Sequence, residues 1–240
     1  MTDAWSEIMR DAADGVSGQY LIERDDGRIE TLEVGDYIKP FEEWDEPERQ
    51  AIKHVKGRVL DIGCGAGRVA IYLQILGYDV VGIDLAPGAV EASRRMGLKE
   101  AYVMSANDLA FSNEIFDTVV MYGNNFGVAG EEEQVLSMLR TLHKITSPNA
   151  VILAGSANAT NTDVEDHLKY HQMNRDRNRP PGLVRIRVKY KDYVTEWSDL
   201  WLVTLEELEK LTQKSGWQID KICQTGKINQ PAYVAVLSKR

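Results

Sequence analysis

The chain has 240 residues, of which 43% are hydrophobic and 27% charged, and its formal net charge is −9. This length and composition are typical of a folded globular protein with one domain, or one domain and a sizeable insertion, and they exclude a disordered chain. The acidic charge disfavours a protein that coats nucleic acid, because phosphate contacts require Lys and Arg.

The sequence also bears on the cellular setting. No apolar run approaches the roughly 18 residues of a membrane-spanning helix, so we expect no membrane partner. The start, MTDAWSEIMRDAADG, lacks the basic and apolar parts of a signal peptide. Cys64 and Cys223 are too few and too far apart for a disulfide scaffold or a metal-binding cluster. We therefore expect a reduced, cytoplasmic protein.

Residues 1–40 are polar and acidic, and we interpret them as an N-terminal cap segment. Apolar alternation around Tyr20 to Ile22 leads into Asp25, Asp26 and Gly27, a turn signal that predicts a hairpin. Residues 41–55 then carry apolar side chains at helical spacing, and Gly57 ends this predicted helix.

From Arg58 onward, apolar strands alternate with helical stretches. The strands are predicted over residues 59–62, 79–83, 102–104, 116–122 and 150–154, and the helices over 69–76, 86–96 and 131–146. Such alternation, with strands that are apolar on both faces, indicates an α/β domain whose parallel sheet is covered by helices. We assign residues 41–240 to this domain.

An insertion is predicted at about residues 157–203, where the alternation stops. Within NRDRNRPPG, residues 174–182, Pro180 and Pro181 exclude a regular helix, whereas the spacing of His167 and His171 before it fits a possible helix. In VRIRVKYK, apolar residues alternate with Arg185, Arg187, Lys189 and Lys191, which is typical of a strand with one basic face, so we expect antiparallel structure. Thr204 and Glu207 then form a capping-box pattern, followed by a helix and two closing strands over 219–223 and 232–237.

The stretch VLDIGCGAGR, residues 59–68, carries the strongest chemical signal. A strand ends at Asp61, and Gly63, Gly65 and Gly67 then turn the chain into a helix, where glycines let the backbone approach a ligand. The next strand ends at Asp84, 19 residues after Gly65, the spacing of an acidic residue that binds a nucleoside ribose in doubly wound folds.

Two cofactor classes compete for this turn. A dinucleotide site requires G-x-G-x-x-G, whereas here the spacing is G-x-G-x-G and Arg68 occupies the place of the third glycine. The Asp61 carboxylate is a poor neighbour for a pyrophosphate and a good one for an ammonium group. S-adenosylmethionine, with a ribose at one end and an amino acid at the other, therefore fits better.

These motifs resemble the class I S-adenosylmethionine-dependent methyltransferases. The matching segments are VLDIGCGAGR at 59–68, VVGID at 80–84, MSANDLAF at 104–111, FDTVVMYGNN at 116–125 and the closing pattern SGWQIDKI…AYVAVLSK. The resemblance implies a Rossmann-like, doubly wound sheet of seven strands with the last strand antiparallel. It also implies binding of S-adenosylmethionine and S-adenosylhomocysteine.

The resemblance assigns cofactor contacts residue by residue. Asp61, Gly63 and Gly65 would hold the methionine end, with Cys64 in the same loop, and Asp84 would bind the ribose hydroxyls. Leu85 would pack on the adenine. The usual acidic residue near the adenine is replaced by Ser105, which leaves the Ala106 N–H and the Asn107 side chain as substitutes.

The acceptor is less well defined by the sequence. In the family, the turn from Tyr122 to Phe126 borders the sulfonium and the acceptor. It lacks the N/D-P-P-Y/F and Pro-Cys patterns, which disfavours amide-type and covalent-cysteine routes, and a small-molecule acceptor gains by elimination. The catalytic candidates are Tyr122, Asn124, His167 and His171. We predict no metal, because the two histidines lack further ligands.

Several alternatives remain open. Residues 169–191 are strongly basic, either because they bind RNA or an acidic acceptor, or because they form a solvated strand face. Little aromatic interleaving disfavours nucleic acid. Trp197 and Trp201 could form core or line an acceptor pocket. An RNA or protein methyltransferase, a non-catalytic S-adenosylmethionine-binding protein and a nicotinamide-dependent reductase are the competing functions.

Overall fold

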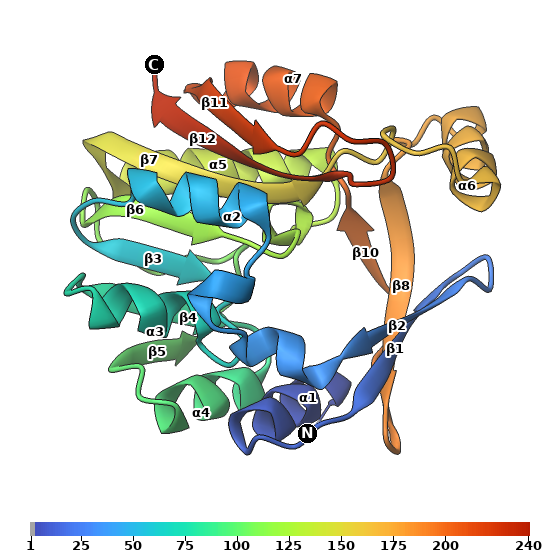
Figure 1. The fold of residues 1–240 in the computed structure, drawn as a ribbon. Coiled ribbons are helices and arrows are strands. Elements are labelled where there is room, and N and C mark those ends of the chain that lie inside the picture. The colour runs from blue at the N-terminus through green and yellow to red at the C-terminus, as the bar shows by residue number, and fades with distance from the viewer. Residues whose placement is uncertain (1–2) are drawn as a thin grey trace.

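The computed structural model describes residues 3–240 and contains two β-sheets (Figure 1). The larger has seven strands in the order β11-β12-β7-β6-β3-β4-β5. Their bounds are β3 Val59–Ile62, β4 Val80–Asp84, β5 Glu100–Val103, β6 Phe116–Met121, β7 Thr146–Ala157, β11 Trp217–Gln224 and β12 Ala232–Lys239. Only β12 runs antiparallel to its neighbours, β7 and β11. The predicted doubly wound, seven-stranded fold is confirmed.

Helices cover both faces of this sheet (Figure 1). They are α2 Glu46–Ala51, α3 Arg68–Ile75, α4 Pro87–Arg95, α5 Glu132–Ile145 and α7 Leu205–Ser215. Successive strand residues point to opposite faces, so Val119 packs in the cluster under α5 and α7 while Val120 packs in the cluster under α2 and α3. The predicted capping box at Thr204 and Glu207 is present at the start of α7.

A second, antiparallel sheet stands beside the carboxyl ends of β3, β4 and β6 (Figure 1). It joins β1 Gln19–Arg24 and β2 Ile29–Glu33 to β8 Leu183–Tyr190, and β8 also pairs with β9 Tyr193–Val194 and β10 Ser198–Trp201. The predicted hairpin and the predicted antiparallel insertion therefore share one sheet, with β1 paired directly to β8.

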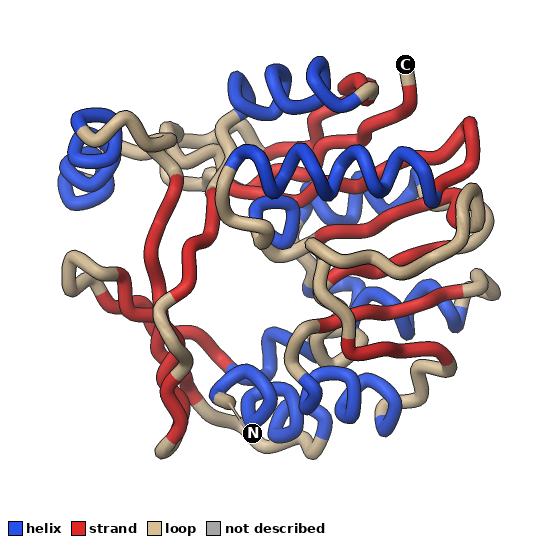
Figure 2. Tube along the Cα trace, turned by 180° about the vertical axis from the view of Figure 1, so that it is seen from behind, coloured by secondary structure: helices blue, strands red, loops and turns tan. Residues whose placement is uncertain are grey.

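Two local predictions need correction. Residues Ala4–Ala13 form a helix, α1, that we did not expect; Asp3 caps it by accepting a hydrogen bond from the Ser6 N–H at 2.8 Å. It lies beside α4 and reaches the inner face of β8 (Figure 2). The helix predicted over 41–55 is instead divided into η2 Phe41–Glu43, α2 and η3 Ile52–His54. Pro47 lies in the first turn of α2, where its missing N–H has no partner to lose, so it fits the start of a new helix and does not fit the interior of a longer one.

Two remaining elements complete the chain. A short 3-10 helix, η1 Val34–Ile38, follows β2, and α6 Glu165–Asp176 lies between β7 and β8, at the outer end of the antiparallel sheet (Figure 1). None of the helices within residues 3–240 is both long enough and apolar enough to cross a bilayer.

Candidate cofactor site

The glycine turn connects β3 to α3 at the carboxyl edge of the larger sheet. Gly63, Gly65 and Gly67 have φ angles of 75°, 54° and 94°, which side chains of L-residues resist. The N–H groups of Gly63 and Cys64 both donate to the Ile83 carbonyl, at 2.8 and 3.0 Å. The turn is thus pinned against the end of β4.

Asp84, the last residue of β4, faces this turn. Its carboxylate accepts hydrogen bonds from the Gly65 N–H at 3.0 Å and the Ala86 N–H at 2.9 Å. Burial raises the pKa of Asp84, and these two backbone donors oppose that shift. Leu85 follows with 71% of its surface exposed, an unusual exposure for a large apolar side chain. The Asp84 carboxylate therefore shapes the glycine turn.

Asp61 is the deepest carboxyl group of the site. Its residue surface is 3% exposed, and its Oδ2 atom has no hydrogen-bond partner. Burial raises the pKa of Asp61 to about 7, against the opposing effect of the Arg68 guanidinium. A buried, unpartnered carboxylate oxygen is costly unless a cation or donor completes it. This oxygen is suited to an ammonium group.

Asn125 is a residue of this site that the sequence analysis missed. Its side-chain amide donates to the carbonyls of Ile62 and Gly63 at 3.0 and 3.1 Å, so it joins the turn after β6 to the glycine turn. A Cβ atom on Gly63 would come within 2.6 Å of the Asn125 Cγ. A protein side chain, that of Asn125, thus fills the space beside Gly63, where we expected the methionine end of the cofactor. The position of Asn125 in the turn after the fourth parallel strand, β6, was the sequence signal that could have identified it.

The N-terminal segment lies against the same turn. A Cβ on Gly65 would lie 3.3 Å from the Met9 sulfur and 3.7 Å from the Tyr37 ring. Tyr37 shares a 2.8 Å hydrogen bond with the Tyr20 hydroxyl. Met9 was not foreseen, because α1 itself was not predicted.

Ser105, Ala106 and Asn107 form a compact turn after β5. The Ser105 hydroxyl accepts from the Asn107 N–H at 3.1 Å, and the Met104 N–H donates to the Asp84 carbonyl at 3.0 Å. The turn is therefore adjacent to Asp84. Cys64 is buried, and burial raises the pKa of its thiol, so it packs in the loop as a neutral side chain.

The turn after β6 carries the other candidates near the glycine turn. The Tyr122 hydroxyl is buried and donates to the Glu48 carbonyl at 3.0 Å, so its side chain points into the protein beneath α2. Asn124 adopts a left-handed backbone conformation, with φ of 69°, at the tip of the turn. Of these two side chains, only that of Asn124 is partly exposed.

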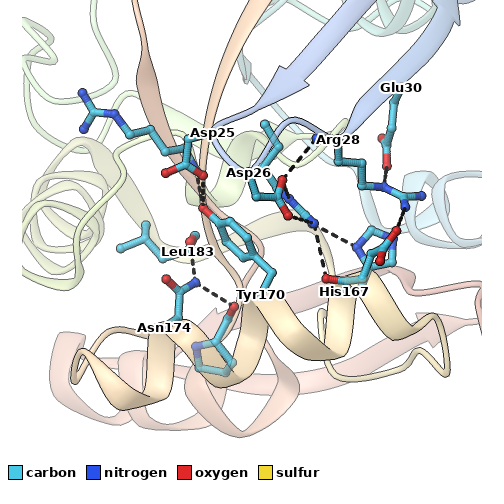
Figure 3. Close-up of polar contacts among 12 residues, drawn as sticks. Asp25, Asp26, Arg28, Glu30, His167, Tyr170, Asn174 and Leu183 are labelled. Atoms are coloured by element: carbon cyan, nitrogen blue, oxygen red, sulfur yellow. Dashed lines mark hydrogen bonds and ion pairs between the residues drawn. The ribbon is translucent and has the colours of Figure 1, made fainter.

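His167 and His171 lie together on α6, with their ring centroids 6.4 Å apart. Arg24 of β1 donates to the His167 Nδ1 at 3.0 Å, which leaves no free lone pair on that ring once the proton sits on Nε2 (Figure 3). His171 is 4% exposed, and burial lowers its pKa to about 4, which keeps it neutral near pH 7. Neither ring lies in a group of potential metal ligands, because no such group occurs within residues 3–240.

The basic strand face is largely paired with acids. Glu23 of β1 receives Arg187 at 2.8 Å and also Lys189. Asp199 of β10 lies within 3.7 Å of Arg185. The guanidinium of Arg187 also covers the Trp197 ring, whereas Trp201 is buried in the apolar core.

Comparisons with known proteins agree with this geometry. Residues 59–149 match the family model described as a methyltransferase domain. A ubiquinone biosynthesis O-methyltransferase of Azorhizobium caulinodans is 30% identical over 122 residues, which cover 47% of this chain and 46% of that protein. One of Cereibacter sphaeroides is 26% identical over 72% of this chain and 64% of its own length. The chain spans about half the length of the curated relatives it matches.

A solved structure resembles the whole fold. It is a methyltransferase of Bacteroides fragilis, crystallised in complex with S-adenosyl-L-homocysteine. The alignment covers 99% of this chain and 95% of that one, with a TM-score of 0.81 and 22% sequence identity. The similarity therefore includes the antiparallel sheet and α1 as well as the larger sheet.

Proposed function

We propose that this chain, whose residues 59–149 match a methyltransferase domain, transfers a methyl group from S-adenosylmethionine to a small molecule. The observation that carries the proposal is the unpartnered Asp61 oxygen beside a glycine turn that Asp84 holds in place. A cationic amino acid at one end and a ribose at the other would meet these two carboxylates in turn.

The residues present fit this cofactor. Asp61 would receive the ammonium group, while the backbone of Gly63, Cys64 and Gly65 would line the methionine end. Asp84 would accept from the ribose hydroxyls with lone pairs that its two backbone donors leave free. For the adenine, we propose the exposed Leu85 and the turn of Ser105, Ala106 and Asn107.

The cofactor would supply a methyl group already activated by its sulfonium. The contribution of this chain is to align the acceptor with that methyl group, and such positioning is worth roughly 7–11 kcal/mol. The turn from Tyr122 to Asn124 would border the transfer, with Tyr122 acting through its backbone. A hydroxyl acceptor also has to lose a proton, and His171, which is buried and has its pKa lowered to about 4, is a weak base for that step.

Two observations support a small acceptor that reacts through oxygen. The relatives from Azorhizobium and Cereibacter are named as O-methyltransferases of ubiquinone biosynthesis. The basic strand face, on which an RNA acceptor would depend, is largely paired with Glu23 and Asp199.

We further propose residues 1–40 as a cap on a domain of residues 41–240 with its insertion at about 157–203. We place the protein in the cytoplasm, in keeping with two free, buried cysteines.

The proposal can be tested in two stages. Thermal unfolding with S-adenosylmethionine, S-adenosylhomocysteine, NAD and NADP should show stabilisation by the first two only. Transfer of a labelled methyl group to a cell extract should then label the small-molecule fraction. Stabilisation by NAD alone would overturn the cofactor, and label confined to RNA or protein would overturn the acceptor class.

A further inference from the structure

Arg68 stands where a dinucleotide-binding turn has its third glycine, and its side chain is held in a fixed position. Its guanidinium makes two parallel hydrogen bonds to the Glu48 carboxylate, at 2.8 and 2.9 Å. Its central carbon lies 4.6 Å from the centroid of the Trp44 ring. The Arg68 and Glu48 side chains are 19% and 11% exposed. This is a largely buried, bidentate ion pair, unlike a solvated surface contact.

Glu48 holds more than Arg68. Its backbone carbonyl accepts the Tyr122 hydroxyl at 3.0 Å. Residue 48 of α2 thus fastens both the first residue of α3 and the end of β6, the two segments that flank Asp61. A buried ion pair adds little net stability over apolar residues of the same volume, because desolvation offsets the attraction. Stability is therefore a weak explanation of this ion pair, and its charge is the other property to consider.

The charge of Arg68 acts on Asp61, as the groups around that carboxyl show. The charged and titratable groups that face it are Arg68 of α3, Glu48 of α2, Asp84 of β4, Cys64 and Tyr122. Burial and the two acids favour the neutral carboxyl, whereas Arg68, and to a lesser degree the backbone N–H of Ala70, favour the carboxylate. A neutral Asp61 would lose most of its attraction for an ammonium group.

The position of the guanidinium is as important as its charge. The Asp61 Oδ2 has no hydrogen-bond partner, so Arg68 does not occupy it. Both Nη atoms of Arg68 are instead taken by Glu48. Arg68 therefore acts on Asp61 through its electrostatic field, and Glu48 keeps its N–H groups away from the oxygen that a ligand would use.

We propose that Arg68 is a positioning residue of the cofactor site: held off by Glu48 and Trp44, it maintains the negative charge of Asp61 and leaves the buried Oδ2 without a protein partner, so that an ammonium group can take that place. The assignment of that ammonium group rests on the proposed function.

Two variants that break the same ion pair test this proposal, because they change the charge near Asp61 in opposite directions. Arg68→Met removes the positive charge. Glu48→Gln removes a negative charge and keeps nearly the same side-chain shape. Binding of S-adenosylhomocysteine is measured by calorimetry between pH 5.5 and 9. We expect Arg68→Met to move the midpoint of the pH dependence upward by about one unit, so that affinity falls about fivefold near neutral pH, up to about tenfold at lower pH, and recovers at alkaline pH. We expect Glu48→Gln to move the midpoint downward.

A purely structural ion pair predicts a different result. Both variants would then lose affinity equally at every pH, and that outcome would overturn the proposal. Arg68→Lys is the conservative variant: it keeps the charge without the two-pronged geometry, and its midpoint should stay close to that of the parent. It also provides the test if Arg68→Met fails to fold.

A second measurement separates this inference from the proposed function. Carbon NMR of the Asp61 carboxyl reports its titration in the protein without ligand. Opposite shifts in Arg68→Met and Glu48→Gln support the role of Arg68 even if the parent does not bind S-adenosylhomocysteine, an outcome that would overturn the proposed function alone. Parent binding with no shift in either variant would overturn the role of Arg68 alone.

Discussion

The two sheets of this protein are held in place by different kinds of contact. The seven-stranded sheet is packed on both faces by apolar clusters, with Phe116 and Leu139 on one side and Leu73 and Val120 on the other, all buried. In the described residues, those clusters and the one beneath α1 include no side chain of α6.

Polar contacts attach α6 to the antiparallel sheet instead (Figure 3). The Tyr170 hydroxyl donates to Asp25 at 2.7 Å, and its ring lies beneath the Arg24 guanidinium at 4.2 Å. The Asn174 amide donates to the Leu183 carbonyl at 2.8 Å.

The comparison indicates where the molecule is rigid and where it can open. Apolar burial is not directional and adds up over many side chains, whereas a hydrogen bond contributes about 1 kcal/mol net because water competes for both partners. Elements with few apolar contacts open at low free-energy cost. We therefore expect the glycine turn to stay fixed while α6 opens, and four experiments can contradict or refine this difference.

The largest effect should come from Asp84→Ala, in the rigid region. The change removes the acceptor of two backbone hydrogen bonds and the proposed ribose contacts, and hydrogen bonds to a charged group are each worth roughly 1.5–3 kcal/mol. Affinity for S-adenosylhomocysteine should fall tens-fold or more by calorimetry. Asp79→Ala, in an exposed ion pair with Arg58, is the control. Unchanged affinity in Asp84→Ala would exclude the ribose assignment.

Gly63→Ala should have the next largest effect. Gly63 and Gly77 both have positive φ, so alanine costs roughly 1 kcal/mol of backbone strain at either position. At Gly63 the new methyl group also collides with Asn125, whereas nothing lies within 4 Å of it at Gly77. Urea unfolding should show a clearly greater loss for Gly63→Ala than for Gly77→Ala. Equal losses would mean that the turn is as free to adjust as the surface.

Acidification should release α6 before the larger sheet. Burial lowers the pKa of His171 to about 4, and burial together with Arg28 and Arg24 lowers that of His167. The fold therefore favours the neutral rings, and this contribution is complete above pH 6.5 and is lost as the pH falls from 6.5 toward 4.

Hydrogen exchange, corrected for its intrinsic pH dependence, should speed up in residues 165–176 over this range. In His167→Gln, the share of this acid-induced increase in exchange that comes from protonation of His167 should disappear. Exchange that rises equally in β3 and β6 would contradict a separate opening of α6.

The smallest effect should come from replacing Arg185 and Arg187 together with alanine. Their partners Asp199 and Glu23 are partly exposed, and water and salt screen such surface ion pairs, so we expect little loss of stability. Cofactor affinity should stay within twofold, and RNA binding should be absent in parent and variant alike. A folded double variant that binds the cofactor but has lost methyl transfer would place these arginines in an acceptor pocket.

The predictability of each region follows the same division. The glycine turn and Asp84 were visible in the sequence because strand, turn and helix are local and their spacing is set by backbone geometry. The pairing of β1 with β8 was not visible, since Glu23 and Arg187 are 164 residues apart in the sequence and nothing in either segment specifies the strand with which it pairs. The helix α1 had a usable local signal in Asp3, Ile8 and Ala12, which the acidic composition obscured. Asn125 shows a different limit, because its role depends on how two turns face each other.

The pairing of β1 with β8 also sets an order of events during synthesis. A growing chain completes β1 and β2 early, but the strand that covers the other edge of β1 begins only at Leu183. Five strands of the larger sheet, β3 to β7, emerge in between. The first hairpin must therefore wait with an open edge, the kind of exposed backbone that invites association with other chains. The N-terminal segment reaches its final partners only after most of the molecule has been made.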